Sequence, residues 1–281
     1  IGTGFIIRPE MICETDGPIG TAALARAVKV AFDATPIVFT EHDNLEIVTA
    51  ACRGMGLNVR RSVKDASEAR FGVCVEEFPI EDDKAKQEAT RILEQYEPSS
   101  VISVERPGKN IKGVYHSFRG FNISDTSAKF DHVFELANER GVLTIGIGDV
   151  GNELGMGNIQ ETVLEHVPHA KKCQCPCGAG TACAISSDVP VVAAVSNWGG
   201  YGIAAVLAVM MERFEVLHDS VLERRAIREC VDAGAIDGET GHCEPSVDGL
   251  GDELHAAIVD LLSKVIRSGV SLKRGEHPIP T

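Results

Sequence analysis

The residues best suited to chemistry lie in one glycine-rich segment, Gly146 to Gly157, which reads GIGDVGNELGMG. Its five glycines leave the backbone bare, so that a ligand can approach the amide groups closely. Asp149, Asn152 and Glu153 stand among them, and the apolar run Val142 to Ile145 before them predicts a buried strand. In an open α/β sheet, ligands bind at the carboxyl ends of the strands. We therefore predict that these three polar residues are catalytic.

Further carboxylates occupy comparable positions, after predicted strands or in glycine-rich turns. If the strands are parallel, these side chains converge on one edge of the sheet, where clustered carboxylates must bind protons or a cation. Oxygen-only ligands suit Mn²⁺ or Mg²⁺ better than zinc or copper. The predicted ligands of this cation are Glu14, Asp16, Glu105, Asp149, Glu153 and Asp248.

Several groups suit an anionic substrate. About twenty residues with little periodicity begin at Glu105 and carry Arg119 and Lys109, basic groups in an otherwise acidic chain. The segment before a predicted helix at 22–32, with Asp16 as its N-cap, offers free amides as an anion cradle. We predict that the substrate-binding residues are Arg119, Lys109, Gly17, Gly20, Thr21 and Asn197.

Two common motifs compete for the glycine-rich segment, and neither fits. Gly146, Gly148 and Gly151 match the dinucleotide fingerprint G-x-G-x-x-G. However, Asp149 and Glu153 would face the pyrophosphate with like charge, and no second strand ending in an acidic residue follows about twenty residues later. A G-x-S-x-G nucleophile elbow is absent from the sequence, which argues against a serine hydrolase of that type.

Four cysteines lie close together in the segment HAKKCQCPCGAGTAC, at Cys173, Cys175, Cys177 and Cys183. They raise the alternative of a zinc or redox site. Structural zinc sites usually pair cysteines two to four residues apart, twice, whereas here three alternate and the fourth is remote. We interpret them as reduced loop cysteines. The odd total of nine cysteines also favours a reducing compartment.

Strand and helix patterns alternate along the chain, which is typical of a parallel α/β sheet. The sequence predicts a three-layer α/β fold, with a mostly parallel sheet flanked by helices, in a single domain over residues 1–281. Predicted strands lie at 4–7, 35–40, 71–75, 99–104, 142–145 and 189–195. Predicted helices lie at 22–32, 44–55, 82–96, 127–140, 158–166, 203–217, 221–233 and 254–266.

Composition excludes some functions. The net charge of −14 argues against nucleic-acid binding, because phosphate backbones are held by basic patches. No apolar run reaches the ~18 residues that a membrane span needs. We expect a cytoplasmic protein, or a mitochondrial matrix protein if a eukaryotic member has lost its targeting segment. A homodimer is the default expectation for its assembly.

The motifs together resemble one family. ETDGPIGTAALARA (14–27), ERPG (105–108), GVYHSFRG (113–120), GIGDVGNELGMG (146–157) and VSNWGGYG (195–202) are similar to the D-glutamate cyclase-like C-terminal domain family. The resemblance extends to about Gly251. It implies the cyclisation of D-glutamate to 5-oxo-D-proline with loss of water, while stand-alone archaeal relatives look like Mn²⁺-dependent phosphatases.

Three functions follow as hypotheses. In a cyclase, the substrate amine attacks its own γ-carboxyl group, Asp149 or Glu153 accepts the ammonium proton, and Arg119 or Lys109 holds the α-carboxylate. In an Mn²⁺- or Mg²⁺-dependent phosphatase, the same carboxylates hold the metal and the amides of 17–21 hold the phosphate of a small metabolite. In a non-catalytic domain, the site senses a small anion. The resemblance favours the cyclase.

Overall fold

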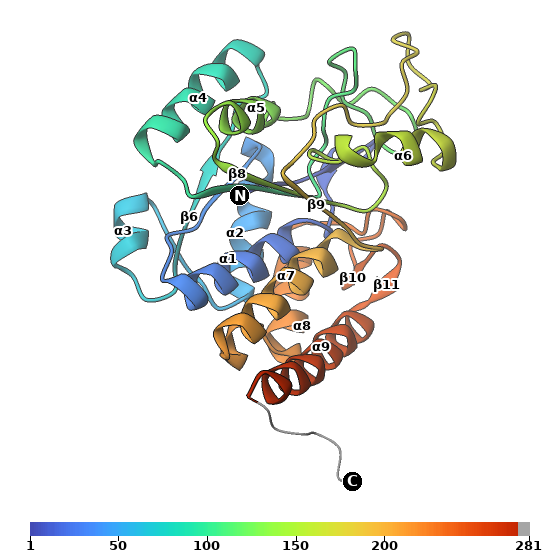
Figure 1. Cartoon of the computed structure of the whole chain (residues 1–281). Helices are drawn as coiled ribbons and strands as arrows, with labels where there is room; N and C mark the ends of the chain where they lie inside the picture. The colour runs from blue at the N-terminus through green and yellow to red at the C-terminus, as the bar shows by residue number, and fades with distance from the viewer. Residues whose placement is uncertain (275–281) are drawn as a thin grey trace.

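The computed structural model describes residues 1–274 and is built on a seven-stranded sheet, parallel throughout (Figure 1). The spatial order of its strands is β5-β6-β4-β1-β7-β8-β9. In chain order they are β1 (Gly2–Thr3), β4 (Ile37–Thr40), β5 (Asn58–Arg60), β6 (Gly72–Glu77), β7 (Ser100–Val104), β8 (Leu143–Gly148) and β9 (Val189–Val192).

Helices cover both faces of the sheet, which confirms the predicted three-layer α/β fold (Figure 1). One layer holds α1 (Pro18–Phe32), α2 (Leu45–Gly54), α7 (Ser196–Met211), α8 (Ser220–Asp232) and α9 (Asp252–Lys273). The opposite layer holds α4 (Asp82–Gln95) and α5 (Asp131–Glu139). The short α3 (Val63–Glu68) packs on β5 and β6, and α6 (Gln160–His166) lies among long loops. Single 3₁₀ turns occur at η1 (His42–Asn44), η2 (Gly157–Ile159) and η3 (Phe214–Val216).

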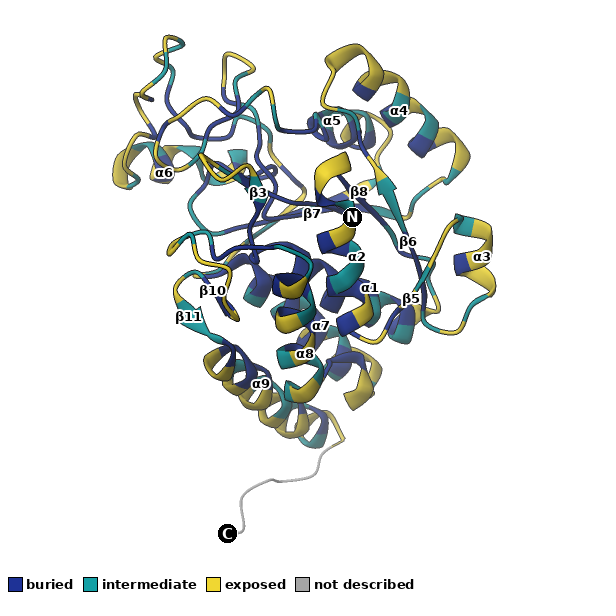
Figure 2. Cartoon of the chain, turned by 180° about the vertical axis from the view of Figure 1, so that it is seen from behind, coloured by how far each residue is buried: buried dark blue, intermediate teal, exposed yellow. Residues whose placement is uncertain are grey.

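Buried residues lie on both faces of the sheet (Figure 2). The two cores that they form differ in the size of their side chains. Beneath α4 and α5, a cluster of phenylalanines packs edge-on and tilted, with ring centroids 5.2–6.3 Å apart. On the other face, α1 and α7 contribute mostly alanine and glycine. A Cβ added at Gly20 would lie 2.6 Å from the Cα of Asn197, so glycine is needed where the starts of these two helices cross.

The first predicted strand, 4–7, is placed differently. The strand that joins the main sheet is Gly2–Thr3, because Gly4 turns the chain away with a φ of +106°. The following residues form a small hairpin of β2 (Ile6–Ile7) and β3 (Ile12–Cys13). Arg106, which is buried, donates hydrogen bonds to the carbonyls of Thr3 and Gly4 and fixes this turn.

Two helix N-termini cap each other, which the sequence pattern did not predict. Asp16 does not cap its own helix α1; its carboxylate accepts from the amides of Ser196 and Asn197, both at 2.8 Å, and so caps α7. In return, the side-chain oxygen of Asn197 accepts from the amides of Gly17 at 2.9 Å and Gly20 at 2.6 Å. Because of this cap, α7 begins at Ser196 rather than at the predicted residue 203.

The sheet changes winding direction between its two central strands. β1 leads into α1 on one face, while its neighbour β7 leads into α5 on the other face. A crevice forms outside the carboxyl ends of strands at such a switch point, and ligands of doubly wound sheets bind there. The residues that follow β1 and β7 are therefore placed for function.

Replacing Asn197 with alanine should destabilise the fold, because the buried amide of Gly20 loses its acceptor and the amide of Gly17 keeps only the carboxylate of Asp16. A buried unsatisfied amide costs about 1–3 kcal/mol, so we expect N197A to lower the free energy of unfolding by about 1–3 kcal/mol in urea titrations. The control Q87A, at an exposed glutamine, should change it by no more than about 0.5 kcal/mol. Equal stability of the two variants would contradict the reciprocal cap.

Candidate active site

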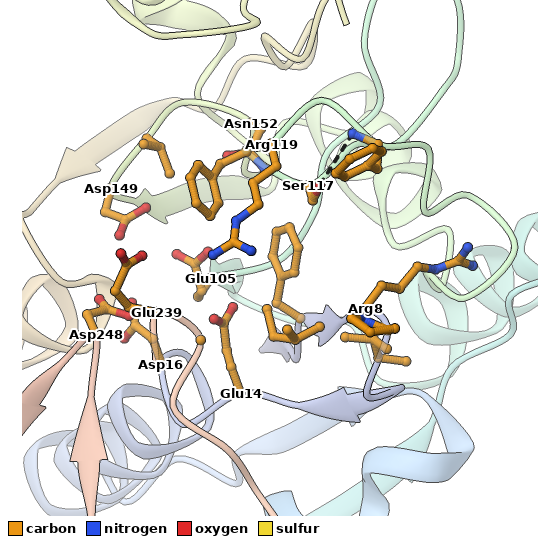
Figure 3. Close-up of a pocket in the computed structure, with 18 of the residues that line it drawn as sticks. Arg8, Glu14, Asp16, Glu105, Ser117, Arg119, Asp149, Asn152, Glu239 and Asp248 are labelled. Carbon is orange, nitrogen blue, oxygen red and sulfur yellow. Dashed lines mark hydrogen bonds between the residues drawn. The ribbon is translucent and has the colours of Figure 1, made fainter. Parts of the chain in front are cut away.

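A cavity of 440 Å³ opens at the carboxyl edge of the central strands (Figure 3). This volume lies within the range of small-molecule sites, about 300–1,000 Å³. Most of its polar wall was predicted from the sequence: Glu14, Asp16, Glu105, Asp149, Asn152 and Asp248. The opposite wall includes Arg119, Ser117 and the aromatic rings of Phe5, Phe118 and Phe121.

The acidic residues come from four separate segments. Glu14 and Asp16 lie between β3 and α1, Glu105 directly follows β7, and Asp149 directly follows β8. Asp248 comes from far along the chain, at the tip of the hairpin formed by β10 (Ser246–Val247) and β11 (Leu250–Gly251). The parallel sheet therefore collects the first three segments at one edge, as predicted, and the hairpin adds the fourth.

Local chemistry explains how Asp248 reaches the cavity. Asp248 and Gly249 both have positive φ, 52° and 74°, as the central residues of a type I′ hairpin turn require. The buried Asp237 accepts hydrogen bonds from the amide of Gly249 at 2.8 Å and the hydroxyl of Ser246 at 2.6 Å. This second carboxylate fixes the hairpin so that Asp248 faces the other acids.

Glu153 holds the glycine-rich segment rather than lining the cavity. Its carboxylate accepts from the amides of Val150 at 3.1 Å and Gly151 at 2.7 Å, and its side chain is fully buried. A Cβ added at Gly148 would lie 2.5 Å from this carboxylate, so glycine is needed there. Since Glu153 occupies these amides, they are not available to a pyrophosphate, which supports the rejection of a dinucleotide site.

Burial raises the pKa of the carboxyl groups around the cavity, and mutual repulsion adds to the effect. It raises the pKa of Glu14 and of Glu105 well above the ordinary range, and that of Asp149 to about 10. The pKa of Asp248 rises to about 8. Burial also raises the pKa of Asp16, but three backbone amides stabilise its charged form and limit the value to about 6.

Several buried oxygens here have no partner within the described part of the chain. They are Oδ1 of Asp149, Oδ1 of Asn152 and Oδ2 of Asp248. Carboxylate oxygens of Asp16, Asp149 and Asp248 also lie within 4.8 Å of one another, as do those of Glu105, Asp149 and Glu153. Such oxygen acceptors fit a bound proton or a hard cation of the Mg²⁺ or Mn²⁺ type.

The two predicted basic residues are separated by the fold. Arg119 is exposed and points its guanidinium group into the cavity toward the carboxylates (Figure 3). Lys109 does not line the cavity, because its amine forms an ion pair with Glu135 of α5 at 2.7 Å. Of these two residues, Arg119 is therefore the one placed to meet a substrate.

The predicted anion cradle at the start of α1 is closed. The amides of Gly17 and Gly20 donate to Asn197, and the amide of Thr21 donates to the carbonyl of Gly17. Asn197 is fully buried and also donates to the carbonyl of Thr15. Gly17, Gly20 and Thr21 do not line the cavity, and their amides are hydrogen-bonded within the protein.

Some residues of the site were not predicted. Glu239 and Arg8 also line the cavity. Glu239 lies far from any predicted strand end, whereas Arg8 directly follows the predicted strand at 4–7, a signal that was not used. In the sequence alone, Arg106 could be a surface charge, yet it is 1% exposed and forms a bidentate ion pair with the buried Glu41. The available signal for the role of Arg106 was its position directly after Glu105, at the end of a central strand.

Fold and cavity together define a doubly wound α/β protein with an acidic cavity of small-molecule size at its switch point. The model of the family D-glutamate cyclase-like, C-terminal, matches residues 1–263, and the chain belongs to this family. It is also 27% identical to human mitochondrial D-glutamate cyclase over 267 residues, which cover 92% of this chain. The chain spans 38% of that relative's length. Among residues 1–274, we find no helix long and apolar enough to cross a membrane.

Removing the Glu153 side chain should loosen the glycine-rich segment. E153A leaves two amides without their charged acceptor, and charge-assisted hydrogen bonds contribute about 1.5–3 kcal/mol each. Two such bonds predict a loss of about 3–6 kcal/mol in the free energy of unfolding, together with faster hydrogen exchange at 149–155. The control E165A, whose side chain is 73% exposed, should match the wild type. Unchanged exchange in E153A would contradict this role.

Proposed function

We propose that this chain is an enzyme that cyclises D-glutamate to 5-oxo-D-proline in the acidic cavity. The observation that carries the proposal is the opposition of charge across the cavity, with carboxyl groups on one side and Arg119 reaching in from the other. An amino acid with two carboxylates and one ammonium group matches both poles. The family, and the name of the human relative, support the same substrate.

Arg119 and the carboxyl groups on the other side of the cavity suggest how the substrate is oriented. Arg119 would bind the α-carboxylate, since a guanidinium group donates paired hydrogen bonds to a carboxylate. The ammonium group would then face Glu14, Glu105 and Asp149. The aromatic side chains of Phe118 and Phe121 border the same space and would exclude water from the reacting atoms, which strengthens these contacts.

The reaction requires transfer of protons from nitrogen to oxygen. The amine nitrogen attacks the γ-carboxyl carbon, a C–N bond forms, a C–O bond breaks, and the departing oxygen leaves as water with two protons from the ammonium group. Asp149 faces the cavity, and its raised pKa favours the protonated form, which can donate to the departing oxygen. Asp16, with a pKa of about 6, is ionised at neutral pH and can accept a proton. Glu153 positions Asp149 through the glycine-rich segment.

A divalent cation also fits the cavity, as the unpartnered oxygens indicate. As an alternative to a proton on Asp149, we propose that Asp16, Asp149 and Asp248 would hold Mn²⁺ or Mg²⁺. Asp149 would then be ionised, and the cation would take over its role at the departing oxygen. Bound there, the ion would supply Lewis-acid stabilisation of negative charge on a substrate oxygen.

The oxygen cluster also favours a second candidate, an Mn²⁺- or Mg²⁺-dependent phosphatase. Its predicted phosphate cradle is filled by Asn197, however, so phosphate would have to rely on Arg119 and the cation. The cyclase therefore remains the stronger proposal. A domain that binds the small anion without turnover is the third outcome that an assay must separate.

The purified protein should release 5-oxo-D-proline from D-glutamate, measured by chromatography on a chiral column. Parallel assays contain Mn²⁺, Mg²⁺ or EDTA, with p-nitrophenyl phosphate as the alternative substrate. Phosphate release without 5-oxoproline would replace the cyclase with the phosphatase. Binding of D-glutamate without either product would leave the sensing function.

Substitutions on the two poles should affect kcat/KM differently. R119A loses charge-assisted hydrogen bonds of about 1.5–3 kcal/mol, which corresponds to a fall of roughly 10- to 150-fold in kcat/KM, largely through KM. D149N removes the proton donor and should lower kcat by about 10²- to 10⁴-fold. The controls R61A and D83N, both at exposed positions, should retain wild-type rates. Full activity in D149N would contradict its assignment.

Mn²⁺ or Mg²⁺ should stabilise the folded protein if the cation site exists. At 100 times the dissociation constant, binding adds about 2.7 kcal/mol, which raises the melting temperature by several degrees. D248N should reduce this rise, and D83N should preserve it. A melting temperature that does not respond to either ion would mean that the acidic side chains hold protons instead.

A further inference from the structure

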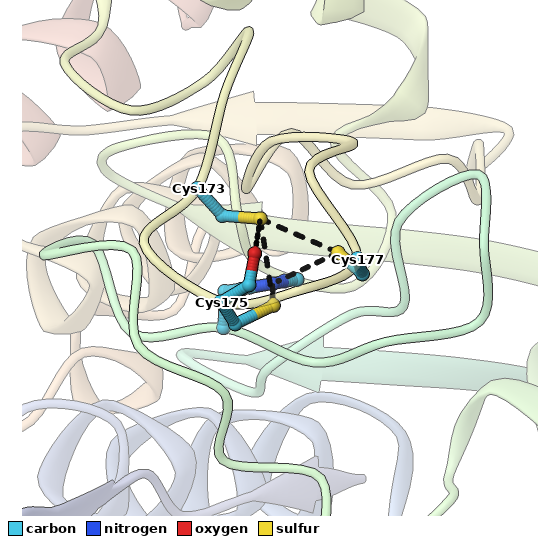
Figure 4. Close-up of side chains that lie close together, drawn as sticks. Cys173, Cys175 and Cys177 are labelled. Atoms are coloured by element: carbon cyan, nitrogen blue, oxygen red, sulfur yellow. Dashed lines mark hydrogen bonds between the residues drawn. The ribbon is translucent and has the colours of Figure 1, made fainter.

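The cysteine-rich loop closes on a histidine from a distant segment. Cys173, Cys175 and Cys177 turn their sulfur atoms toward one another (Figure 4). The Nε2 atom of His116 joins them, 3.2 Å from the sulfur of Cys175 and 3.5 Å from that of Cys177. Cys183 is not a member, because its sulfur contacts the backbone of Ile185.

The spacing of these atoms is that of a tetrahedral metal site. The sulfur of Cys173 lies 3.5 Å from that of Cys175 and 3.3 Å from that of Cys177, and all four ligand atoms lie within 4.8 Å of one another. With zinc–sulfur bonds of about 2.3 Å, the sulfurs of a tetrahedral site stand roughly 3.7 Å apart. One ion at the centre would need only small shifts of these side chains.

A disulfide or a group of packed thiols would use fewer of these contacts. A disulfide requires sulfurs about 2.05 Å apart, and any single bond among three cysteines leaves one thiol and the histidine without a partner. Reduced thiols packed for burial would not need an imidazole, which in His116 is only 1% exposed. Three thiolates and one neutral imidazole are a donor set that soft thiolate-binding ions such as zinc select.

We propose that His116, Cys173, Cys175 and Cys177 bind one structural Zn²⁺ ion, separate from the acidic cavity. The four protein ligands fill a tetrahedral shell, so no position is open for a substrate, as in structural zinc sites. On binding, three thiol protons pass to solvent while three zinc–sulfur bonds form, and the zinc–ligand group carries a net charge of −1. Lys112 lies beside the site, with its amine 2.8 Å from the carbonyl of Cys177.

The ion would hold two irregular segments together. The chain runs without helix or strand from Val167 to Asp188, and a loop of this length in a compact domain needs its own restraint. The second irregular segment, which packs against this loop, carries His116. The two segments already meet where the side chain of Asn110 donates to the carbonyl of Gly180 at 2.7 Å and where the amide of Gln174 donates to the carbonyl of Gly120 at 2.8 Å.

This restraint also reaches the cavity. Ser117, Phe118 and Arg119 follow His116 directly and line the cavity wall. In addition, the carbonyl of His116 accepts from the side chain of Asn152 in the glycine-rich segment, at 2.9 Å. Zinc at His116 would therefore fix the position of Arg119 from outside the cavity.

Metal analysis of the full chain tests the proposal directly. Protein produced with zinc in reducing buffer and then passed through a chelating resin should retain one zinc per chain. Replacing zinc with Co²⁺ should give thiolate-to-cobalt charge-transfer absorption and the strong visible bands of tetrahedral cobalt. A cation held by the oxygen ligands of the acidic cavity gives neither signal, so the two sites are distinguished.

Variants locate the ligands. C175S and H116A should each lower zinc content to less than a tenth of the wild-type value after chelation, while C183S and C243S should retain it. Limited proteolysis should then cleave C175S within 105–124 at least tenfold faster than C243S. Wild-type protein without zinc, or a cobalt spectrum without thiolate absorption, would overturn the proposal even if a variant failed to fold.

Discussion

The reciprocal cap between Asp16 and Asn197 is the constraint on which the rest of the site depends. Each residue supplies the acceptors that the other's helix lacks at its N-terminus, where backbone amides have no partner within the helix. The exchange fixes α1 against α7 at the carboxyl edge of the sheet. Gly20 permits this close approach. Because Asp16 is held here by three amides, its carboxylate remains beside Asp149 and Asp248 despite their like charge.

The fold therefore holds the carboxyl groups of the acidic cavity together against their mutual repulsion. Burial and repulsion raise the pKa of Glu14, Glu105 and Asp149, so these groups must hold protons or share a cation. Neighbouring interactions supply the rigidity that keeps them together: Glu153 ties the glycine-rich segment, and Asp237 ties the hairpin. Groups with displaced pKa values in a cavity are typical of functional sites. The same displacement makes a carboxyl group able to donate a proton at neutral pH.

The sequence predicted what depends on local pattern and missed what depends on contacts across the chain. Periodicity predicted the layers, and strand ends predicted the acidic residues, because parallel strands bring their carboxyl ends to one edge. The free amides of Gly17 and Gly20 were a wrong expectation, since their acceptor lies far along the chain in Asn197. Lys109 was predicted to bind substrate beside Arg119, but in the folded protein Glu135 of α5 holds its amine in an ion pair. The cysteine spacing lacked a fourth ligand for the same reason, because His116 joins it only in the folded protein.

We propose that the cavity binds an amino acid between its carboxyl groups and Arg119. A crystal structure of the protein with bound D-glutamate tests this most directly. The α-carboxylate should lie on the guanidinium group of Arg119 and the nitrogen near Asp149, within reach of the γ-carboxyl carbon. Electron density for the ligand outside the cavity, or with its nitrogen turned toward Arg119, would contradict it.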